Sequence, residues 1–329
     1  VMVCSYPLTE DDAEQTPSDL LPASTLAAAD ALPAPGLYAA QLAGTTDLAD
    51  LADRVPPIAP DEHLSGGAGT IQNQLTDPIA AFLGGRLGVR ALDEQTDGLP
   101  ALLRGNLIHD ALYQLYFDKP SRDDIAGWTD IDQRISNAID FAFGRHERHA
   151  DQVLLALLAM ERRRVAGLLH DFIAIDIERG AFIVDSVERS VEFAEAGVRL
   201  KLRVDRIDRL PDDRLAILDY KTGAEKKFLT SKGEPKEIQL VAYACAVDEP
   251  VAALALVNVD SRTMGFNGAG AGYSDPESWP EQLASWSTLV RSACTELTAG
   301  EVRLYVSTSM ADARPLNLLT RFTELRNDL

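Results

Sequence analysis

Asp205, Asp219 and Lys221 carry the clearest chemical potential, in the segment VRLKLRVDRIDRLPDDRLAILDYKTG of residues 198–223. Its alternation of apolar and polar residues predicts two strands joined by a turn. If the turn is centred on Asp212, Asp205 in the first strand faces Asp219 in the second. Carboxylates that face each other repel and destabilise a hairpin. A divalent cation would relieve this repulsion, because Mg²⁺ binds one or two carboxylates and completes its shell with water and phosphate oxygens.

The same register divides the hairpin into two faces, because side chains alternate along a strand. We expect one face to carry Arg203, Asp205, Ile207, Ile217, Asp219 and Lys221. We expect the other face to pack as core through Leu202, Val204, Leu218 and Tyr220. Lys221 could then hold an attacking water and offset charge on a phosphate. Alternatively, Arg203 and Lys221 neutralise the two acids as surface ion pairs, which contribute little.

A second group of residues lies in RGNLIHDAL, inside a predicted helix over 101–117. Gly105 and His109 are one helical turn apart. A glycine inside a helix costs roughly 1 kcal/mol relative to alanine, so Gly105 is useful where another backbone or a ligand approaches closely. His109 could offer a neutral imidazole to a metal, or it could be structural. Arg104 could contact a phosphate or simply be solvated.

Gln239 and Tyr243 share one face of a helix predicted over about 236–247, because they are four residues apart. Four lysines precede them: Lys226, Lys227, Lys232 and Lys236. An amide and a phenol beside lysines suit a nucleic-acid strand or the bracing of Lys221, and ordinary helix packing is the alternative. Glu188, on the first predicted strand, is either a partner of Lys221 or an exposed acid.

A mixed set of helices and strands must position these residues. Apolar spacing predicts helices over 72–92, 101–117, 129–147, 150–177, 236–247, 276–299 and 315–327. A period of two, and one short apolar run, predict strands over 181–194, 197–209, 214–220 and 251–258. This order predicts an α/β domain whose mixed sheet contains an antiparallel hairpin and is flanked and covered by helices.

The charge of the 329-residue chain is −20, which alone argues against nucleic-acid binding. The charge is uneven, however. Residues 1–62 hold eleven acids and one base, whereas residues 199–236 hold eleven bases and seven acids. A cationic segment of this kind could receive an anionic ligand, and a solvated hairpin of mixed charge is the alternative.

Cys4, Cys245 and Cys294 are few and far apart, which argues against a disulfide framework or a thiolate metal site. The sequence shows neither an apolar run of membrane length nor a signal peptide, so we predict a cytoplasmic protein. Residues 1–65 are acidic and rich in proline and alanine, and we interpret them as a linker. The opening VMVCSYPL reads like the end of a strand, so we expect the chain to be the C-terminal part of a longer protein.

Together the motifs resemble the RecB-like nucleases of the PD-(D/E)XK superfamily. The order in that family is a G-x3-H helix, a G-x-x-D-R-I-D-like strand, a D-Y-K-T strand and a Q-x3-Y helix. Here the same order appears as Gly105 with His109, RVDRID at 203–208, DYKT at 219–222, and Gln239 with Tyr243. The resemblance covers residues 66–329 and implies a nuclease domain with a restriction-endonuclease-like core.

The resemblance also implies roles for individual residues. It implies Mg²⁺ or Mn²⁺ bound by His109, Asp205, Asp219 and the Tyr220 carbonyl. It implies Lys221 as the catalytic lysine, and we add Asp205, Asp219, Gln239 and Tyr243 to the catalytic set. We expect DNA contacts from Arg104, Arg203, Lys226, Lys227 and Lys232. The implied activity is hydrolysis of DNA phosphodiesters, as a single-strand exonuclease in repair and recombination. The sequence has no Walker motif, so a helicase motor would lie in a partner or in a preceding region.

Two flanking segments, GGAGTIQNQLTDPIAAFLGGRLGV and ARPLNLLTRFTELR, are similar to AddB-type helicase–nuclease subunits. Many of those proteins hold an iron–sulfur cluster through one upstream cysteine and three near the C-terminus. Here Asp77 stands at the upstream position and the tail has no cysteine, so we expect no cluster, which would need thiolates. Arg203 stands where the family often has glycine, and it could contact phosphate or crowd the site. The alternatives are a catalytically silent scaffold or DNA clamp beside a helicase, and a nuclease acting on RNA.

Overall fold

The structure, a computed structural model, describes residues 9–10, 13–14, 54–59, 62–90, 98–148 and 150–303. The chain divides into two compact units, Val1–Ala52 and Asp53–Leu329. In the first unit, strand β1 (Thr9–Glu10) pairs antiparallel with β2 (Ala13–Glu14). The helix predicted over 315–327 and Cys4 fall outside the described residues. The predicted division into a linker over 1–65 and a domain over 66–329 stays a prediction.

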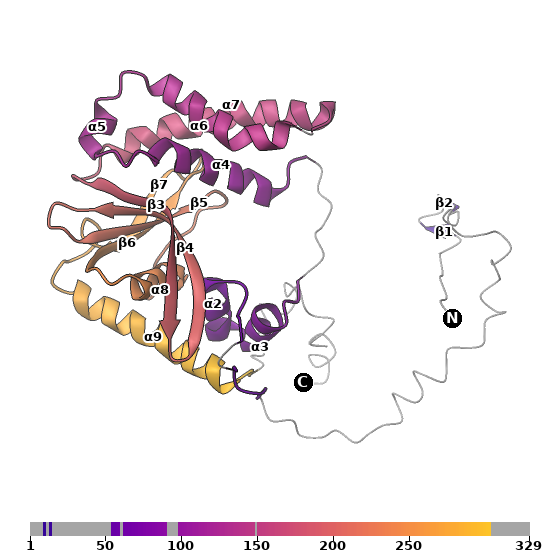
Figure 1. The fold of residues 1–329 in the computed structure, drawn as a ribbon, viewed down its shortest axis with the longest axis vertical. Coiled ribbons are helices and arrows are strands. Elements are labelled where there is room, and N and C mark those ends of the chain that lie inside the picture. The colour runs from indigo at the N-terminus through magenta and orange to yellow at the C-terminus, as the bar shows by residue number, and fades with distance from the viewer. Residues whose placement is uncertain are drawn as a thin grey trace. The chain divides into compact units, whose positions relative to one another are not determined.

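A five-stranded mixed sheet forms the centre of the second unit, with the strand order β3-β4-β5-β6-β7 (Figure 1). The strands are β3 (Ile183–Glu195), β4 (Val198–Arg209), β5 (Leu215–Lys221), β6 (Val251–Asn258) and β7 (Gly265–Gly270). Neighbouring strands are antiparallel except β5 and β6, which are parallel. A parallel pair needs a crossover connection, and the segment between β5 and β6 provides it through helix α8 (Gln239–Ala246).

Helices cover both faces of this sheet (Figure 1). One face packs against α4 (Ala101–Tyr116), α6 (Ile131–Glu147) and α7 (Gln152–Asp176). The other packs against α2 (Ala68–Thr76), α8 and α9 (Trp279–Ala299). The described chain also contains α3 (Pro78–Ala80), a π-helical turn η3 (Ala81–Arg86) and α5 (Arg122–Ala126). The predicted α/β class, a mixed sheet with an antiparallel hairpin flanked by helices, is confirmed.

The register predicted for the central hairpin agrees with the structure. Ile207 of β4 pairs with Ile217 of β5, as a turn centred on Asp212 requires. The ladder stops one pair short of Asp205 and Asp219. The two aspartates therefore lie one position beyond the last β4–β5 pair, although Asp219 remains paired with Leu256 of β6.

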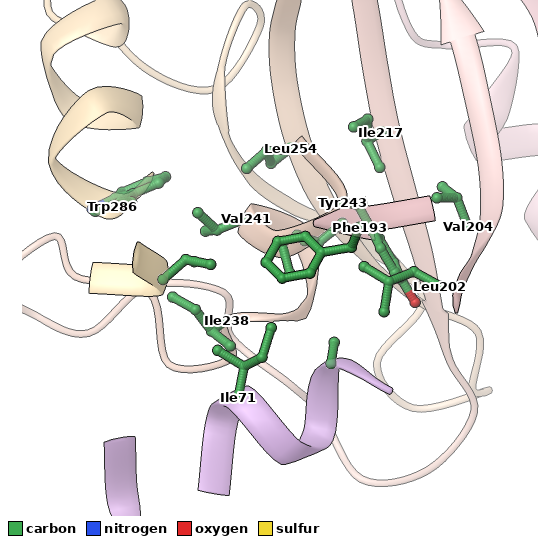
Figure 2. Close-up of a cluster of buried hydrophobic side chains, with 14 of the residues drawn as sticks. Ile71, Phe193, Leu202, Val204, Ile217, Ile238, Val241, Tyr243, Leu254 and Trp286 are labelled. Atoms are coloured by element: carbon green, nitrogen blue, oxygen red, sulfur yellow. The ribbon is translucent and has the colours of Figure 1, made fainter. Parts of the chain in front are cut away.

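Two buried clusters hold the layers together. Figure 2 shows one of them, in which Ile71 of α2, Val241 of α8 and Trp286 of α9 meet Phe193 and Ile217 of the sheet. The second cluster lies between the sheet and α4, α6 and α7. Among the described helices, none has both the length and the apolar character that a membrane crossing needs.

The expected division of the hairpin into one site face and one core face holds in β5 and is wrong in β4. In β5, Ile217 lies in one buried cluster, whereas Leu218 and Tyr220 lie in the other. Leu202 and Val204 lie in the same buried cluster as Ile207 and Ile217, although they were expected on opposite faces. The backbone is irregular next to this point, because the β3–β4 register shifts between Val184 and Ser186 and Glu188 has a φ of 49°. Such irregularities bend a strand and redirect its side chains, which breaks the simple alternation of faces. In addition, helices pack on both faces of the sheet, so both faces contribute to the core.

Some predicted boundaries also differ. The helix predicted over 72–92 is broken after Thr76, because Pro78 cannot donate a helical hydrogen bond and restricts the preceding Asp77 to an extended conformation. The strand β7 was missed because its sequence, GFNGAG, has low strand propensity. A Cβ on Gly268 or Gly270 would lie 2.5 Å or less from a carbonyl oxygen of β6, so glycine is required there by close backbone approach.

Candidate active site

Three side chains from three elements converge at the open end of the hairpin. His109 of α4 places Nδ1 at 3.5 Å from Oδ1 of Asp205 and at 4.0 Å from Oε1 of Glu188. One potential ligand atom from each residue lies within 4.8 Å of the other two. An imidazole and two carboxylates at this spacing could hold one divalent cation.

The main chain of β5 orients Asp205. The Tyr220 backbone N–H donates a 2.7 Å hydrogen bond to Oδ2 of Asp205, which leaves Oδ1 on the side of His109. The Tyr220 ring is buried and meets the His109 ring edge-on, with the ring centroids 5.9 Å apart. Backbone and side chain of Tyr220 thus support both Asp205 and His109.

Lys221 is held by a group of polar side chains beside this cluster. Its Nζ lies 2.8 Å from Oδ2 of Asp219 and 3.0 Å from Oε2 of Glu237, and it donates to Oε1 of Gln239 at 3.1 Å. Gln239 in turn donates through Nε2 to the Tyr243 hydroxyl. An ammonium group has three donors, so these contacts give the lysine a defined orientation and connect β5 to α8.

The pKa values in this site indicate excess negative charge. Burial, followed by the nearby Asp205 carboxylate, raises the pKa of Asp219 to about 7 against the opposing effect of Lys221. The same two causes raise the pKa of Glu188. Burial lowers the pKa of His109, but the hydrogen bond and charge of Asp205 outweigh it and the net pKa is raised. A bound cation would favour the ionised carboxylates in this site.

Gly105 allows α4 to approach the end of β5. A Cβ at this position would lie 3.1 Å from Oγ1 of Thr222, closer than ordinary van der Waals contact. Thr222 directly follows Lys221, and Gly105 is one helical turn before His109. The predicted need for close approach at Gly105 therefore has a physical explanation in the structure.

The two arginines that we predicted to contact DNA lie against acids. Arg104 Nε is 3.3 Å from Oε1 of Glu161 on α7. Arg203 Nε is 2.7 Å from Oε2 of Glu188, and its side chain is 71 % exposed. Glu188 therefore pairs with Arg203 and His109. Both expectations for Glu188 are wrong, because it neither pairs with Lys221 nor stands as an exposed acid without partners.

The predicted DNA-contacting lysines lie on the connection between β5 and α8. Lys226 Nζ is 3.1 Å from Oε1 of Glu237, the acid that also contacts Lys221. Lys227 and Lys232 are exposed. This connection is anchored by Phe228, whose side chain is fully buried. Of these lysines, Lys226 is thus linked to Lys221 through Glu237.

Glu237 is a site residue that sequence reasoning missed. It bridges Lys221 and Lys226, and nothing in its sequence spacing from Lys221 indicates this contact. Burial lowers the pKa of Lys221. The nearby carboxylates of Asp219 and Glu237 outweigh burial, and the net pKa is raised above its ordinary value. Glu237 therefore keeps the ammonium form of Lys221 stable.

A buried charge network behind the site was missed as well. Arg206, adjacent in sequence to Asp205, is fully buried and contacts Asp208 at 2.6 Å and Asp176 at 2.8 Å. Arg179 contacts the same two aspartates at 2.8 Å each. The network ties β4 to α7 with two cations and two anions.

A cavity of about 430 Å³ opens beside the cluster, with His109 and Asp205 in its wall. Gln239 and Tyr243 of α8 also line it. Much of the remaining cavity wall comes from residues 66–69, at the start of α2, and from Lys201 and Arg203 of β4. The lysine-holding residues of α8 and the potential metal ligands therefore share one space.

Residues 70–308 match the family model described as PD-(D/E)XK nuclease superfamily. No curated protein matches the chain. One similar solved structure, titled "Crystal structure of SSO0001", has 12 % sequence identity and covers 69 % of this chain and 87 % of its own, with a TM-score of 0.25. A score this low carries no argument about this chain.

Proposed function

Because the chain belongs to the PD-(D/E)XK nuclease superfamily, we propose that it is a metal-dependent nuclease that hydrolyses DNA phosphodiester bonds. Members of this superfamily are typically nucleases that use divalent metals. The observation that carries the proposal is the juxtaposition of His109, Glu188 and Asp205 with a lysine oriented by Asp219. We further propose that its substrate is single-stranded DNA and that it acts as an exonuclease. Its cellular role would be in repair and recombination, beside a helicase.

The donor set suits Mg²⁺ or Mn²⁺. We propose His109, Asp205, Asp219 and the Tyr220 carbonyl as ligands, and we add Glu188, which lies in the same cluster. Carboxylates with one imidazole are ligands that these cations accept. When bound, the cation would supply Lewis acidity and lower the pKa of a water molecule.

The side chains of the chain itself would do the positioning. Lys221 would hold the attacking water and offset charge that develops on the phosphate. Asp219, Glu237 and Gln239 fix the ammonium group of Lys221. Tyr243 holds the amide of Gln239, so that α8 and β5 present one rigid arrangement to the substrate. Arg104, Lys226, Lys227 and Lys232 would attract the phosphate backbone.

A catalytically silent nuclease fold that clamps DNA is the second candidate function. The specific observation in its favour is Arg203, whose guanidinium lies 2.7 Å from Glu188 and thus offers a protein cation to the cluster. In the nuclease proposal Arg203 instead turns toward a phosphate when a metal binds Glu188.

The decisive experiment is cleavage of labelled single-stranded DNA by the purified chain with Mg²⁺, with Mn²⁺ and with EDTA. Asp219→Ala serves as the inactive variant, and a matched RNA strand tests the preference for DNA. Cleavage that requires metal and disappears in Asp219→Ala is the expected result. If the folded chain binds DNA but no metal supports cleavage, the clamp replaces the nuclease.

A further inference from the structure

Helix α8 begins at a residue that cannot cap it. Ile238 precedes the helix with a φ of −81° and a ψ of −6°, and its apolar side chain cannot accept a hydrogen bond. The first N–H groups of a helix have no acceptor within the helix and need one from elsewhere. For Ile238 the acceptor comes from 166 residues away in the chain, because its backbone N–H donates a 2.7 Å hydrogen bond to Oε1 of Gln72 in α2.

Gln72 thereby holds the centre of a short segment whose two outer residues hold Lys221. Oε2 of Glu237 lies 3.0 Å from the ammonium nitrogen of Lys221, and Oε1 of Gln239 accepts from it at 3.1 Å. These are two of the three acceptors that the structure describes for this ammonium group. A shift of Ile238 would therefore displace two acceptors of the lysine at once.

The helix that carries Gln72 is itself held in place. Ile71, directly before Gln72, and Ile238 are buried in the same apolar cluster, which Figure 2 shows. Two residues further along α2, Nε2 of Gln74 donates a 3.0 Å hydrogen bond to the carbonyl oxygen of Glu301. Because α2 is fixed by this packing and by this second bond, Gln72 offers the start of α8 an acceptor in a defined position.

We propose that Gln72 is a positioning residue of the nuclease site, which fixes residues 237–239 and through them the ammonium group of Lys221. The inference rests on the proposed nuclease function. It gives α2 a share in the site, because α2 sets where the acceptors at the start of α8 stand relative to β5, which carries the lysine. Loss of a group that acts in this way slows the chemical step and leaves substrate binding unchanged.

Gln72→Met tests the proposal, because methionine has a similar length and lacks the acceptor oxygen. The measurement is single-turnover cleavage of a labelled oligothymidine at saturating Mn²⁺. We expect cleavage to slow by about 10–10²-fold, because a displacement of about 1 Å can cost a site 10²-fold in rate. The oligothymidine concentration at half-maximal rate and the Mn²⁺ affinity by calorimetry should both be unchanged.

Two further variants show whether the acceptor oxygen is what matters. Gln72→Glu should restore the rate, because its carboxylate still accepts from the Ile238 N–H and negative charge is favourable at the start of a helix. Gln74→Met is the matched control, since it removes an amide of the same helix that also bonds to a backbone group, at Glu301 instead of α8. Gln74→Met should cut like the wild type.

The reactivity of the Lys221 amine gives a readout that needs no cleavage. Each protein is treated with an amine-acetylating reagent, and modification of Lys221 is followed by mass spectrometry relative to the exposed Lys119. Release of the amine from one acceptor should speed its acetylation by about 10-fold, the effect of losing one hydrogen bond to a charged group. We expect this increase in Gln72→Met, and wild-type reactivity in Gln72→Glu and Gln74→Met.

The outcomes separate this inference from the proposed function. If the wild type cuts and Gln72→Met cuts equally fast, or if Gln72→Glu stays as slow as Gln72→Met, the positioning role is wrong and the nuclease stands. Equal slowing by Gln74→Met would show a general loosening of α2 and would also overturn the role. If the wild type never cuts, the nuclease proposal fails, while faster acetylation of Lys221 in Gln72→Met still supports the link. If Gln72→Met does not fold, Gln72→Asn, whose shorter side chain withdraws the acceptor, replaces it in each comparison.

Discussion

The backbone N–H of Tyr220 donates a hydrogen bond to the Asp205 carboxylate at 2.7 Å, one pair beyond the end of the β4–β5 ladder. This contact fixes one carboxylate oxygen and leaves the other on the side of His109, 3.5 Å from Nδ1. A main-chain donor cannot be removed by changing a side chain. The orientation of Asp205 therefore depends on the hairpin itself, and the following predictions concern the residues that surround it.

Glu188→Gln should weaken Mn²⁺ binding by about 10–100-fold, the range found when groups that support a metal site are removed. The reason is that Glu188 lies within reach of the same cation as His109 and Asp205. Glu192→Gln is the control, because Glu192 is exposed on the same strand. Calorimetric titration of metal-stripped protein measures both. Equal affinities in the two variants would show that Glu188 is no ligand.

Lys221→Ala should slow DNA cleavage by about 10²–10³-fold, as expected for loss of a group that stabilises charge in the transition state. Mn²⁺ affinity should not fall, because removing a cation beside Asp219 lessens competition for that carboxylate. Lys119→Ala, at an exposed position after α4, should cut like the wild type. Single-turnover cleavage at saturating metal is the measurement. Normal cleavage by Lys221→Ala would remove this lysine from the mechanism.

Gly105→Ala should reduce Mn²⁺ affinity and cleavage, because its Cβ would meet Oγ1 of Thr222 at 3.1 Å and displace α4 with His109. Adding Thr222→Ala should restore both properties, since the contacting oxygen is then absent. Gly167→Ala is the control and should stabilise the protein by roughly 1 kcal/mol through helix propensity. A double variant as impaired as Gly105→Ala would contradict this explanation.

Arg206→Met should destabilise the fold by about 3–5 kcal/mol, because it leaves Asp176 and Asp208 buried without this partner. Arg209→Met, on the same strand, should cost only about 0–1 kcal/mol, because its ion pairs are near the surface. Unfolding in urea measures the free energy of both. Similar values for the two variants would mean that the buried network adds nothing particular to stability.

Asp176 should contribute to loss of stability in acid. Burial raises its pKa, but Arg206 and Arg179 outweigh burial and hold the pKa below its ordinary value of 3.8. Above about pH 4 this contribution is fully present. As the pH falls, the unfolded chain takes up a proton first, so the stability is lost progressively through the folded pKa. The Asp176→Asn variant should have a lower free energy of unfolding than the wild type at about pH 6. Its free energy of unfolding should fall less than that of the wild type when the pH is lowered to about 3. An unchanged acid dependence would contradict this assignment.

Much of the fold and of the candidate site was accessible to sequence reasoning because it is local. The turn at Pro211–Asp213 sets the loop length, and loop length sets the register that pairs Ile207 with Ile217. The alternation of apolar residues located β3 to β5, a short apolar run located β6, and the helical period located α4, α6 and α7. These features depend on neighbours in sequence, which the sequence displays directly.

The tertiary structure decided which distant residues meet. Glu188 reaches His109 and Arg203, and Glu237 reaches Lys221, through the packing of separate elements. Periodicity cannot show such contacts, because they depend on the angle and depth at which helices pack on a twisted sheet.

The sequence by itself thus determined the hairpin, its register and the types of residue available for chemistry. Only the folded chain decided that helices bury both faces of the sheet, that Arg206 lies in a closed charge network, and that a cavity lies beside the cluster. The physical reason is that burial and charge pairing are properties of three-dimensional neighbours, and these come from all the layers together.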